Sequence, residues 1–311
     1  MNSEEVDILI SDWSKELGFV DYGAAPVKEM NQEMERFNRY IANNYHGDMS
    51  YLVRNRDLRL NPGLLMQGAC SIMCFLAPYK PKIIQDSSLP RIAAYSYGED
   101  YHEVIKEKLK EIVRRLTLIF PGLKARVFAD SAPILERAWG VEAGLGFIGK
   151  NGFLISKKHG LHTLIGIILT DVPLKYSTES VHNGCGKCTR CLDACPAGAL
   201  VAPMIMDARR CISYQTIESK RLYSDEDFPL DHCGYIFGCD ICLEACPWSL
   251  KGDITSWPEF GPIYSRYHNK KNVEFSREDW IGLSDDLFEE IFKNSPLKRA
   301  GILKIKDNLD K

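Results

Sequence analysis

Two runs of closely spaced cysteines constrain the fold of this chain more than any other feature. The first run places four cysteines at intervals of three, three and four residues before a proline: Cys185, Cys188, Cys191, Cys195 and Pro196. The second run places three cysteines at intervals of three and four before a proline: Cys239, Cys242, Cys246 and Pro247. The two runs echo each other, as CLDACPAGAL and CLEACPWSL. Thiols at such intervals indicate a segment that folds around metal.

The spacing of the first run is that of bacterial ferredoxins, which bind [4Fe–4S] clusters. Three thiolates with two residues between neighbours wrap a loop around one face of a cubane. The fourth thiolate begins a helix directed at a second cluster. Pro196 suits the first turn of that helix, where no N–H is needed. Zinc is the alternative, but zinc ligands usually form two separated CxxC pairs. We therefore predict two [4Fe–4S] clusters between residues 185 and 246.

Two clusters require eight thiolates, and the two runs supply seven. Ile236 stands where the second run would have its first cysteine, so the eighth ligand is Cys211 or Cys233. We predict Cys211, because Cys233 lies only six residues before Cys239. The last cysteine of each run is exchanged between clusters. The expected ligands are Cys185, Cys188, Cys191 and Cys246 for one cluster, and Cys195, Cys211, Cys239 and Cys242 for the other. The remaining thiols, Cys70, Cys74 and Cys233, are expected to be structural.

The rest of the sequence predicts a mixed α/β (α+β) fold. Apolar periodicity predicts helices over 3–17, 29–45, 101–119 and 133–143, and strands over 70–77, 125–129, 153–155 and 164–169. A polar, turn-rich stretch follows near 172–182. We therefore predict three parts: a mixed α/β domain over 1–175, a ferredoxin-like 2[4Fe–4S] domain over 176–250, and a helical segment over 251–311 that packs on the core.

Composition narrows the class of protein further. Hydrophobic residues make up 45% and charged residues 26% of the chain, as in soluble globular proteins. The net charge of −3 gives no global attraction to nucleic acid or anionic membranes. The acidic N-terminus does not resemble a signal peptide, and the apolar run over 164–169 is too short to span a bilayer. We expect a cytoplasmic protein without a membrane partner, whose cysteines are metal ligands rather than disulfides.

A G-x-G-x-x-G sequence spans residues 144–149. A dinucleotide site requires a strand before this motif and a helix after it. Here the predicted order is reversed, because a helix precedes the glycines and a strand follows them. We predict a tight turn that lets a large ligand or another chain approach closely, and no nicotinamide site.

Several stretches resemble epoxyqueuosine reductases, the cobalamin-dependent iron–sulfur enzymes of tRNA queuosine biosynthesis. Besides the cysteine runs, the resembling stretches are residues 98–102, 129–138, 144–151, 207–214, 238–242 and 295–299. The resemblance implies reduction of epoxyqueuosine to queuosine in the tRNA anticodon loop, with cobalamin in the N-terminal domain. It also implies an external electron donor such as a flavodoxin or ferredoxin, and we expect a monomer. Some members continue into C-terminal helical repeats, and contacts made by such repeats are expected to be absent.

The resemblance assigns Asp130 as the proton donor to the epoxide oxygen. An aspartate donates a proton near neutral pH only if its pKa is raised, as by burial. Asp130 follows an apolar strand, which suggests a buried position. The alternative is that Asp130 only caps the helix that begins near Pro133.

The resemblance and local charge add further candidate residues. The expected cobalamin contacts are Asp130, Ser213, Asp240, Ile241, Tyr101, His102 and Arg137. Basic groups near residues 209–221 and 293–306 suggest phosphate contacts, although an ordinary solvated surface is the alternative. The candidate tRNA contacts are Lys220, Arg221, Lys298 and Arg299.

Two other functions fit the cysteine runs. A reductive dehalogenase would use the same cofactors, but such enzymes usually carry a twin-arginine signal that this sequence lacks. A ferredoxin-type electron-transfer protein would leave the first 175 or so residues and Asp130 without a role. We therefore favour the epoxyqueuosine reductase interpretation.

Overall fold

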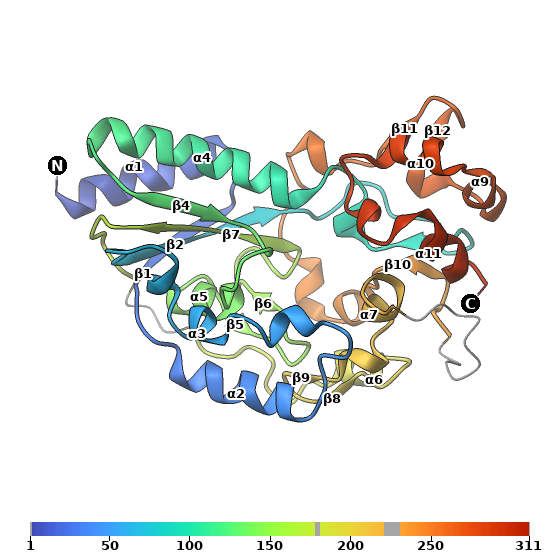
Figure 1. Ribbon diagram of the computed structural model, residues 1–311, viewed down its shortest axis with the longest axis horizontal. Coiled ribbons are helices and arrows are strands. Elements are labelled where there is room, and N and C mark those ends of the chain that lie inside the picture. Colours follow the sequence, from blue (N-terminus) through green and yellow to red (C-terminus); the bar gives the residue numbers. More distant parts are fainter. Residues whose placement is uncertain (1, 178–180, 221–230, 311) are drawn as a thin grey trace.

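A four-stranded antiparallel sheet forms the centre of the N-terminal half (Figure 1). The computed structural model describes residues 2–177, 181–220 and 231–310. In these ranges the sheet order is β1 (Asp21–Pro26), β2 (Ser71–Pro78), β7 (Thr163–Thr170) and β4 (Ala125–Phe128). Each neighbouring pair is antiparallel. The sheet therefore places the end of β4, and the loop after it, at one edge.

Strand β2 organises the core because all eight of its residues are buried. Successive side chains of a strand point to opposite faces. Met73 and Phe75 accordingly join one hydrophobic cluster, whereas Ile72, Cys74 and Leu76 join a second cluster on the other face. Cys74 is thus a buried structural thiol, as expected.

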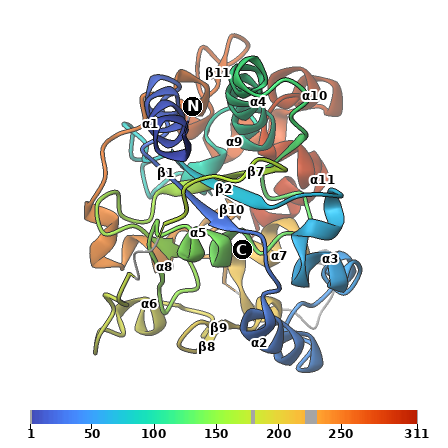
Figure 2. The same ribbon diagram turned by 90° about the vertical axis from the view of Figure 1, so that its left-hand side faces the viewer.

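Helices cover both faces of the sheet (Figure 2). Helices α1 (Ser3–Glu16) and α4 (Tyr101–Ile119) lie on one side. Helices α2 (Asn31–Ala42) and α5 (Glu136–Glu142) lie on the other, together with the short α3 (Arg56–Leu60). None of the helices that the structure describes combines the length and apolarity needed to cross a membrane.

Short elements separated by turns make up the cysteine-rich segment. Its helices are α6 (Arg190–Asp193), α7 (Ile212–Ile217) and α8 (Ile241–Glu244), and its strands are β8 (Leu200–Ala202), β9 (Ile205–Met206) and β10 (Tyr235–Phe237). Strand β10 pairs in parallel with β3 (Arg91–Ile92) of the N-terminal half. This pairing joins the cysteine-rich segment to the rest of the molecule.

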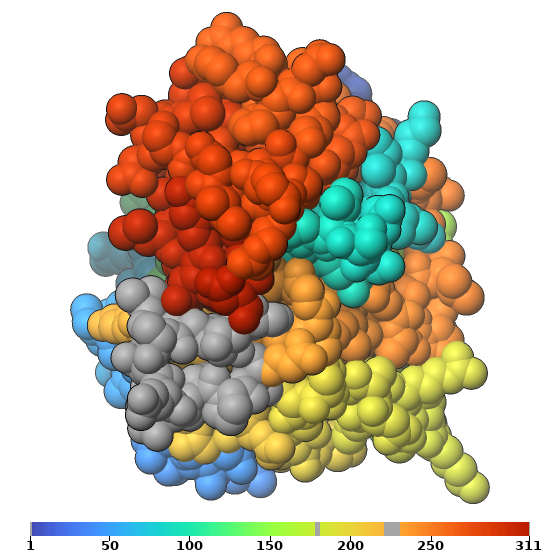
Figure 3. Space-filling view, turned by 90° about the vertical axis from the view of Figure 1, so that its right-hand side faces the viewer, coloured from blue at the N-terminus to red at the C-terminus, as the bar shows by residue number. Residues whose placement is uncertain are grey.

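The C-terminal segment packs against one end of the molecule, above the cysteine-rich segment (Figure 3). It contains β11 (Tyr264–Ser265), β12 (Lys270–Lys271), α9 (Arg277–Gly282), α10 (Asp285–Phe292) and α11 (Gly301–Asn308). One hydrophobic cluster includes Phe75, Phe237 and Phe288, which come from the three predicted parts of the chain. The parts therefore share a core, and their exact boundaries remain a prediction.

One-turn 3₁₀ helices complete the structure. They are η1 (Ser50–Leu52), η2 (Pro62–Leu65), η3 (Ala94–Ser96), η4 (Ala208–Arg210), η5 (Pro247–Leu250), η6 (Pro258–Phe260), η7 (Asn272–Glu274) and η8 (Pro296–Arg299).

The mixed α/β prediction is confirmed, and each predicted helix and strand has a counterpart in the structure. Helix α5 begins at Glu136 rather than near residue 133, and strand β1 was not predicted. The glycine motif lies after α5 and enters the hairpin of β5 (Phe147–Ile148) and β6 (Leu154–Ile155). A Cβ on Gly146 would lie 2.3 Å from the carbonyl oxygen of Ile155. The hairpin itself therefore requires a residue without a Cβ at this position.

Asn308 links the C-terminal helix to the cysteine-rich segment. Its buried side-chain amide donates to the carbonyl oxygens of Thr216 at 3.1 Å and Ile236 at 2.9 Å. Asn308→Ala removes both donors and leaves buried acceptors unpaired, which typically costs roughly 1–3 kcal/mol. We expect a clear fall in the urea midpoint of the anaerobically purified protein. Leu303→Ala is the matched control on the same helix, since Leu303 is 73% exposed. Equal midpoints for the two variants would contradict this role.

Candidate active site and iron–sulfur centres

A cavity of about 440 Å³ lies where the N-terminal half, the cysteine-rich segment and the C-terminal segment meet. Its lining combines apolar, acidic, basic and thiol side chains. The lining includes Tyr95, Asp100, Tyr101, His102, Asp130, Cys211, Ser213, Ile217, Glu218, Phe237, Lys293, Ser295, Lys298 and Arg299. The cavity therefore brings together residues that lie far apart in the sequence.

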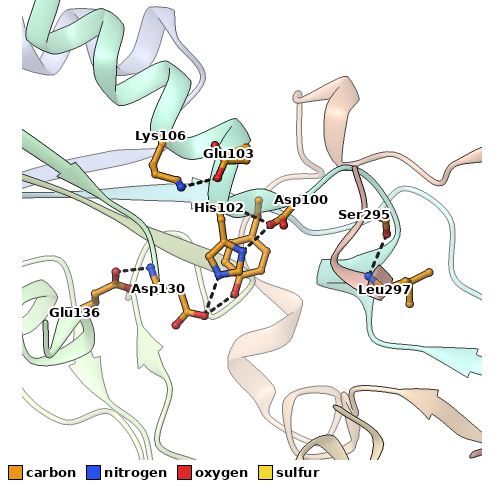
Figure 4. Close-up of polar contacts among 9 residues, drawn as sticks. Asp100, His102, Glu103, Lys106, Asp130, Glu136, Ser295 and Leu297 are labelled. Carbon is orange, nitrogen blue, oxygen red and sulfur yellow. Dashed lines mark hydrogen bonds and ion pairs between the residues drawn. The ribbon is translucent and has the colours of Figure 1, made fainter. Parts of the chain in front are cut away.

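Asp130 projects from the loop after β4 toward the start of α4 (Figure 4). Its backbone has a φ of +56°, which lies in the left-handed region. Tyr101 Oη donates to Asp130 Oδ2 at 2.7 Å, and His102 Nε2 lies 3.3 Å from the same oxygen. The left-handed turn thus directs the carboxylate at two side chains of the facing helix.

The start of α4 holds His102 in place. Asp100 is the N-cap of this helix and accepts from the backbone N–H of His102 at 3.0 Å. The same oxygen, Asp100 Oδ1, lies 2.6 Å from His102 Nδ1. Both ring nitrogens of His102 therefore face carboxylates, and the imidazole forms a bridge from Asp100 to Asp130.

These contacts change the pKa values of the site. Partial burial favours neutral Asp130, but hydrogen bonds from His102 and Tyr101 outweigh it and lower the pKa of Asp130. Burial alone would lower the pKa of His102, yet its bonds to Asp100 and Asp130 raise that pKa to about 9. His102 thus carries a proton at neutral pH, while Asp130 is ionised.

Glu136 is a further acid beside Asp130. Its Oε1 accepts from the backbone N–H of Asp130 at 2.6 Å. Burial, and then the charge of Asp130, raise the pKa of Glu136 to about 8. Glu136 therefore supports the strained peptide at Asp130 and is largely protonated at neutral pH.

Two expectations for Asp130 differ from the structure. The side chain is 57% exposed rather than buried, because it projects from the strand end into the cavity. It also caps no helix, since α5 begins at Glu136 and its N-cap residue is Leu135. The bonds to Tyr101 and His102 take the place of a capping bond.

The four thiols expected to bind the first cluster line a second cavity, of about 320 Å³. They are Cys185, Cys188, Cys191 and Cys246. Within the described ranges, no three Cys, His, Asp or Glu side chains are grouped around a single-ion position. Four thiols that face one cavity are the donor set that a [4Fe–4S] cluster requires, so the lining of this cavity fits a cluster.

The other four thiols also lie near one another. Burial, together with the nearby thiols of Cys211 and Cys195, raises the pKa of Cys239 to about 12. Burial, together with the nearby thiols of Cys211, Cys239 and Cys195, raises the pKa of Cys242 as well. Cys233 also lies near Cys195, but it is not among the thiols that raise the pKa of Cys239 or Cys242 most. Cys211 also lines the large cavity, which therefore adjoins this thiol group.

The remaining predicted cofactor contacts fall into two groups. Tyr101, His102 and Ser213 line the large cavity with Asp130. The others do not line this cavity, and they are Asp240, Ile241 and Arg137. The buried Asp240 accepts from the backbone N–H of Ala94 at 2.7 Å, and Arg137 donates to the carbonyl oxygen of Gly152.

The predicted tRNA contacts are also divided. Lys298 and Arg299 line the large cavity and pair with Glu289 at 3.3 Å and Glu218 at 2.6 Å. Lys220 is exposed but does not line the cavity, and Arg221 lies outside the described residues.

Two lysines of the C-terminal basic group do not form an open phosphate site. Lys304 is buried, and Lys306 Nζ donates to the carbonyl oxygen of Leu283 at 2.7 Å.

The sequence assigned no role to Glu136, although the stretch that resembles the family includes this residue. Only the three-dimensional contact with the Asp130 peptide reveals it.

The fold, the two thiol groups and the cavity beside one of them define an iron–sulfur oxidoreductase. A family model described as a 4Fe-4S double cluster binding domain matches residues 184–249, which confirms the two-cluster prediction. A second model, described as epoxyqueuosine reductase QueG, DUF1730, matches residues 59–131. The chain belongs to the epoxyqueuosine reductase family, as its relatives show.

An epoxyqueuosine reductase of Cyclobacterium marinum is 37% identical over 298 residues, which cover 94% of this chain and 92% of that protein. The enzyme of Escherichia coli is 32% identical, over 95% of this chain and 77% of its own length. A crystal structure of epoxyqueuosine reductase with an epoxyqueuosine-modified tRNA-Tyr stem loop matches with a TM-score of 0.85 and 26% identity, over 99% of this chain and 80% of that one. These matches favour the reductase over the dehalogenase and ferredoxin interpretations.

The identity of the eighth thiolate can be tested directly. Cys211→Ser is expected to lose about half of the cluster iron, or to leave one three-iron cluster, because a [4Fe–4S] cluster normally has four thiolates. Cys233→Ser should retain all of its iron and is the matched control. Iron analysis and electron paramagnetic resonance of the anaerobically purified variants measure the iron content and the type of cluster. Full iron in Cys211→Ser with loss in Cys233→Ser would reverse the assignment.

Proposed function

We propose that the large cavity is where the chain reduces the epoxide of epoxyqueuosine in a tRNA anticodon loop. One observation carries this proposal: the same cavity is lined by Asp130 with its proton-bearing neighbour His102, and by Cys211 of the second thiol group. Removing an epoxide oxygen as water requires two electrons and two protons. The thiol group at Cys211 is the proposed source of the electrons, and the proton on His102 is the first of the two protons. His102 takes up the second proton from solvent.

We assign the cluster ligands as the spacing predicts. Cys185, Cys188, Cys191 and Cys246 hold the first cluster, and Cys195, Cys211, Cys239 and Cys242 hold the second. The shared cavity of the first four thiols and the mutual proximity of the other four support this assignment. The second cluster then lies beside the reaction cavity through Cys211.

The lining of the cavity fits cobalamin, whose corrin ring is broad and apolar and carries amide side chains at its edge. Tyr95, Ile217 and Phe237 offer apolar surface, and Ser213 and Tyr101 offer hydrogen-bonding groups. When bound, cobalamin would supply a strongly reducing centre for attack on the epoxide carbon. Asp240, Ile241 and Arg137 do not line the cavity, so their predicted contacts have less support.

Asp130 gives the proton to the departing epoxide oxygen. The lowered pKa of Asp130 keeps its carboxylate ionised when the cavity is open. The proton is therefore stored on His102 and passes from His102 to the Asp130 carboxylate. When the substrate covers the cavity, it removes water from Asp130. This desolvation raises the pKa of the carboxyl and favours its protonated form. Asp100 stabilises the charged imidazole from its other side.

Basic side chains at the cavity rim suit the RNA backbone. Lys293, Lys298 and Arg299 line the cavity, and cations of this kind bind phosphates. An anticodon loop can place a splayed base in such a cavity. A tRNA substrate places the reaction in the cytoplasm. The monomeric state remains a prediction.

Asp130→Asn tests the catalytic assignment. The amide retains the size and the acceptor oxygen but cannot deliver a carboxylic proton. We expect the variant to keep both clusters and bind cobalamin, and to convert epoxyqueuosine tRNA about 10²–10⁴-fold more slowly, as loss of general acid catalysis predicts. Single-turnover reactions followed by mass spectrometry of the nucleosides measure the rate.

The matched control for this experiment is Glu103→Gln on the first turn of α4. Glu103 pairs with Lys106 and is 66% exposed, and it does not line the cavity. We expect Glu103→Gln to convert epoxyqueuosine tRNA at the normal rate. A normal rate for Asp130→Asn, with cofactors confirmed, would remove Asp130 from catalysis.

The pH dependence of the reaction tests the role of His102. Because its pKa is raised to about 9, His102 is protonated below that pH and loses its proton above it. The single-turnover rate should therefore fall as the pH rises through about 9. His102→Gln keeps a hydrogen-bond donor but does not titrate, so it should be slower and lack this alkaline limb. An unchanged alkaline limb in His102→Gln would show that another group supplies the proton.

A further inference from the structure

The first cluster site is open to the protein surface. Of the eight proposed cluster ligands only Cys188 is exposed, and residues 186–190 around it are exposed as well. The site lies away from the reaction cavity, because the described residues that line one cavity do not line the other. An electron from outside can therefore reach the first cluster without entering the cavity that holds the substrate.

Two one-turn helices lead from the first cluster to the second. Cys191 lies in α6 and Cys195 follows that helix by two residues, while Cys242 lies in α8 and Cys246 follows it. In each pair, one thiol belongs to the first ligand set and the other to the second. The two clusters are thus joined through short backbone segments, and the second adjoins the reaction cavity.

Basic side chains surround the opening of the first cluster site. Lys150, Arg190 and Lys251 line it, and Lys187 is exposed beside Cys188. A hairpin that carries the exposed Lys157 and Lys158 joins this rim. The hairpin packs on residues 248–252, since Lys251 Nζ donates to the carbonyl oxygen of Lys157 at 3.0 Å, and a Cβ on Gly160 would lie 2.5 Å from the carbonyl oxygen of Trp248.

Apolar and acidic groups complete this surface. Trp248 lines the opening, and Leu250, two residues later, is 83% exposed. The nearby acids are Asp193, which accepts from Thr189 at 2.7 Å, and the exposed Asp253. An apolar centre within a charged rim is the usual arrangement of a protein interface. The rim is basic although the chain as a whole has a net charge of −3.

We propose that this surface, formed by residues 157–158, 186–190 and 248–251, is the docking site of an acidic one-electron carrier protein of the flavodoxin type. The proposal rests on the proposed function, which requires an external electron donor. In each encounter the reduced flavin of the carrier loses one electron, and the first cluster changes from the 2+ to the 1+ state. The electron then passes to the second cluster, and two encounters supply the two electrons of one turnover.

Charge complementarity selects an acidic protein for this surface. Opposite charges steer partners together and raise association rates by about 10–10³-fold. RNA is the other polyanion that the protein meets, but its reactive base must reach Asp130, and Lys298 and Arg299 line that separate cavity. The surface around Cys188 is therefore assigned to the electron carrier.

The test uses the double variant Lys157→Glu/Lys187→Glu in the holoprotein. Neither lysine side chain lines a cavity. Stopped-flow mixing with a reduced bacterial flavodoxin at low salt, without tRNA, measures the rate of cluster reduction. We expect a rate about tenfold lower than in the unmodified protein, with the difference shrinking as salt rises because salt screens the charges. Reduction by dithionite, a small molecule, should be unchanged.

A second double variant, Lys15→Glu/Lys175→Glu, makes the same change in net charge elsewhere. These lysines pair with Asp12 at 3.6 Å and Glu4 at 3.5 Å, on the α1 side of the sheet. The clusters of this variant should be reduced by flavodoxin at the normal rate. Equal slowing of both double variants, or no slowing of the first, would overturn the proposal. So would slower reduction by dithionite, which would indicate a damaged cluster.

Binding of the tRNA anticodon stem-loop tests whether this surface binds RNA or the acidic carrier protein. Lys157→Glu/Lys187→Glu should bind the stem-loop with unchanged Kd. A weakened Kd with a normal flavodoxin rate would assign the surface to RNA and overturn the proposal. Because cluster reduction is measured without tRNA, slowing by the variant would support the docking site even if epoxyqueuosine proved not to be the substrate.

Discussion

A hydrogen bond joins two segments of the chain that carry thiols of the second group. The backbone N–H of Gly238 donates to Thr216 Oγ1 at 2.9 Å. Thr216 lies in α7, which follows Cys211, and Gly238 precedes Cys239. Gly238 has a φ of +70°, and a Cβ there would lie 2.5 Å from the Cβ of Ala93. The position therefore requires glycine for two reasons, its conformation and its contact.

The rest of the cavity depends on that connection. Helix α7 supplies Ser213 and Ile217 to the wall, and β10 supplies Phe237. Asn308 ties both elements to α11, and η8, just before α11, supplies Lys298 and Arg299. The C-terminal segment thus positions the basic rim relative to the second thiol group, although it contributes no thiol of its own.

Sequence reasoning was most successful where the chemistry is local. A run of thiols three or four residues apart can be recognised without a fold, and long apolar periodicity located α1, α4, β2 and β7 closely. Strand β1 was missed because its sequence, DYGAAP, lacks the β-branched residues that favour strands. It forms a strand because the buried β2 pairs with it along its full length.

The pKa values of the site could not be predicted from local sequence. Asp130 follows an apolar strand, and that context suggested burial and a raised pKa. The structure turns the residue into the cavity and pairs it with His102, which lowers its pKa instead. His102 is 28 residues away in the sequence, and whether it faces Asp130 depends on how β4 lies beside α4. Lys304 and Lys306 illustrate the same limit, because a basic run does not reveal which of its side chains point inward.

Separate routes for electrons and protons follow from the positions of the two thiol groups. A strong reductant beside an acid would lose electrons to protons if both were freely supplied at one opening. In this fold the exposed thiol, Cys188, belongs to the first group, whereas the proton on His102 is held between Asp100 and Asp130, which line the large cavity. In the proposed assignment, electrons enter the cavity from the second thiol group beside Cys211, and the proton enters it from Asp130. The substrate in the cavity is then the point at which both are used.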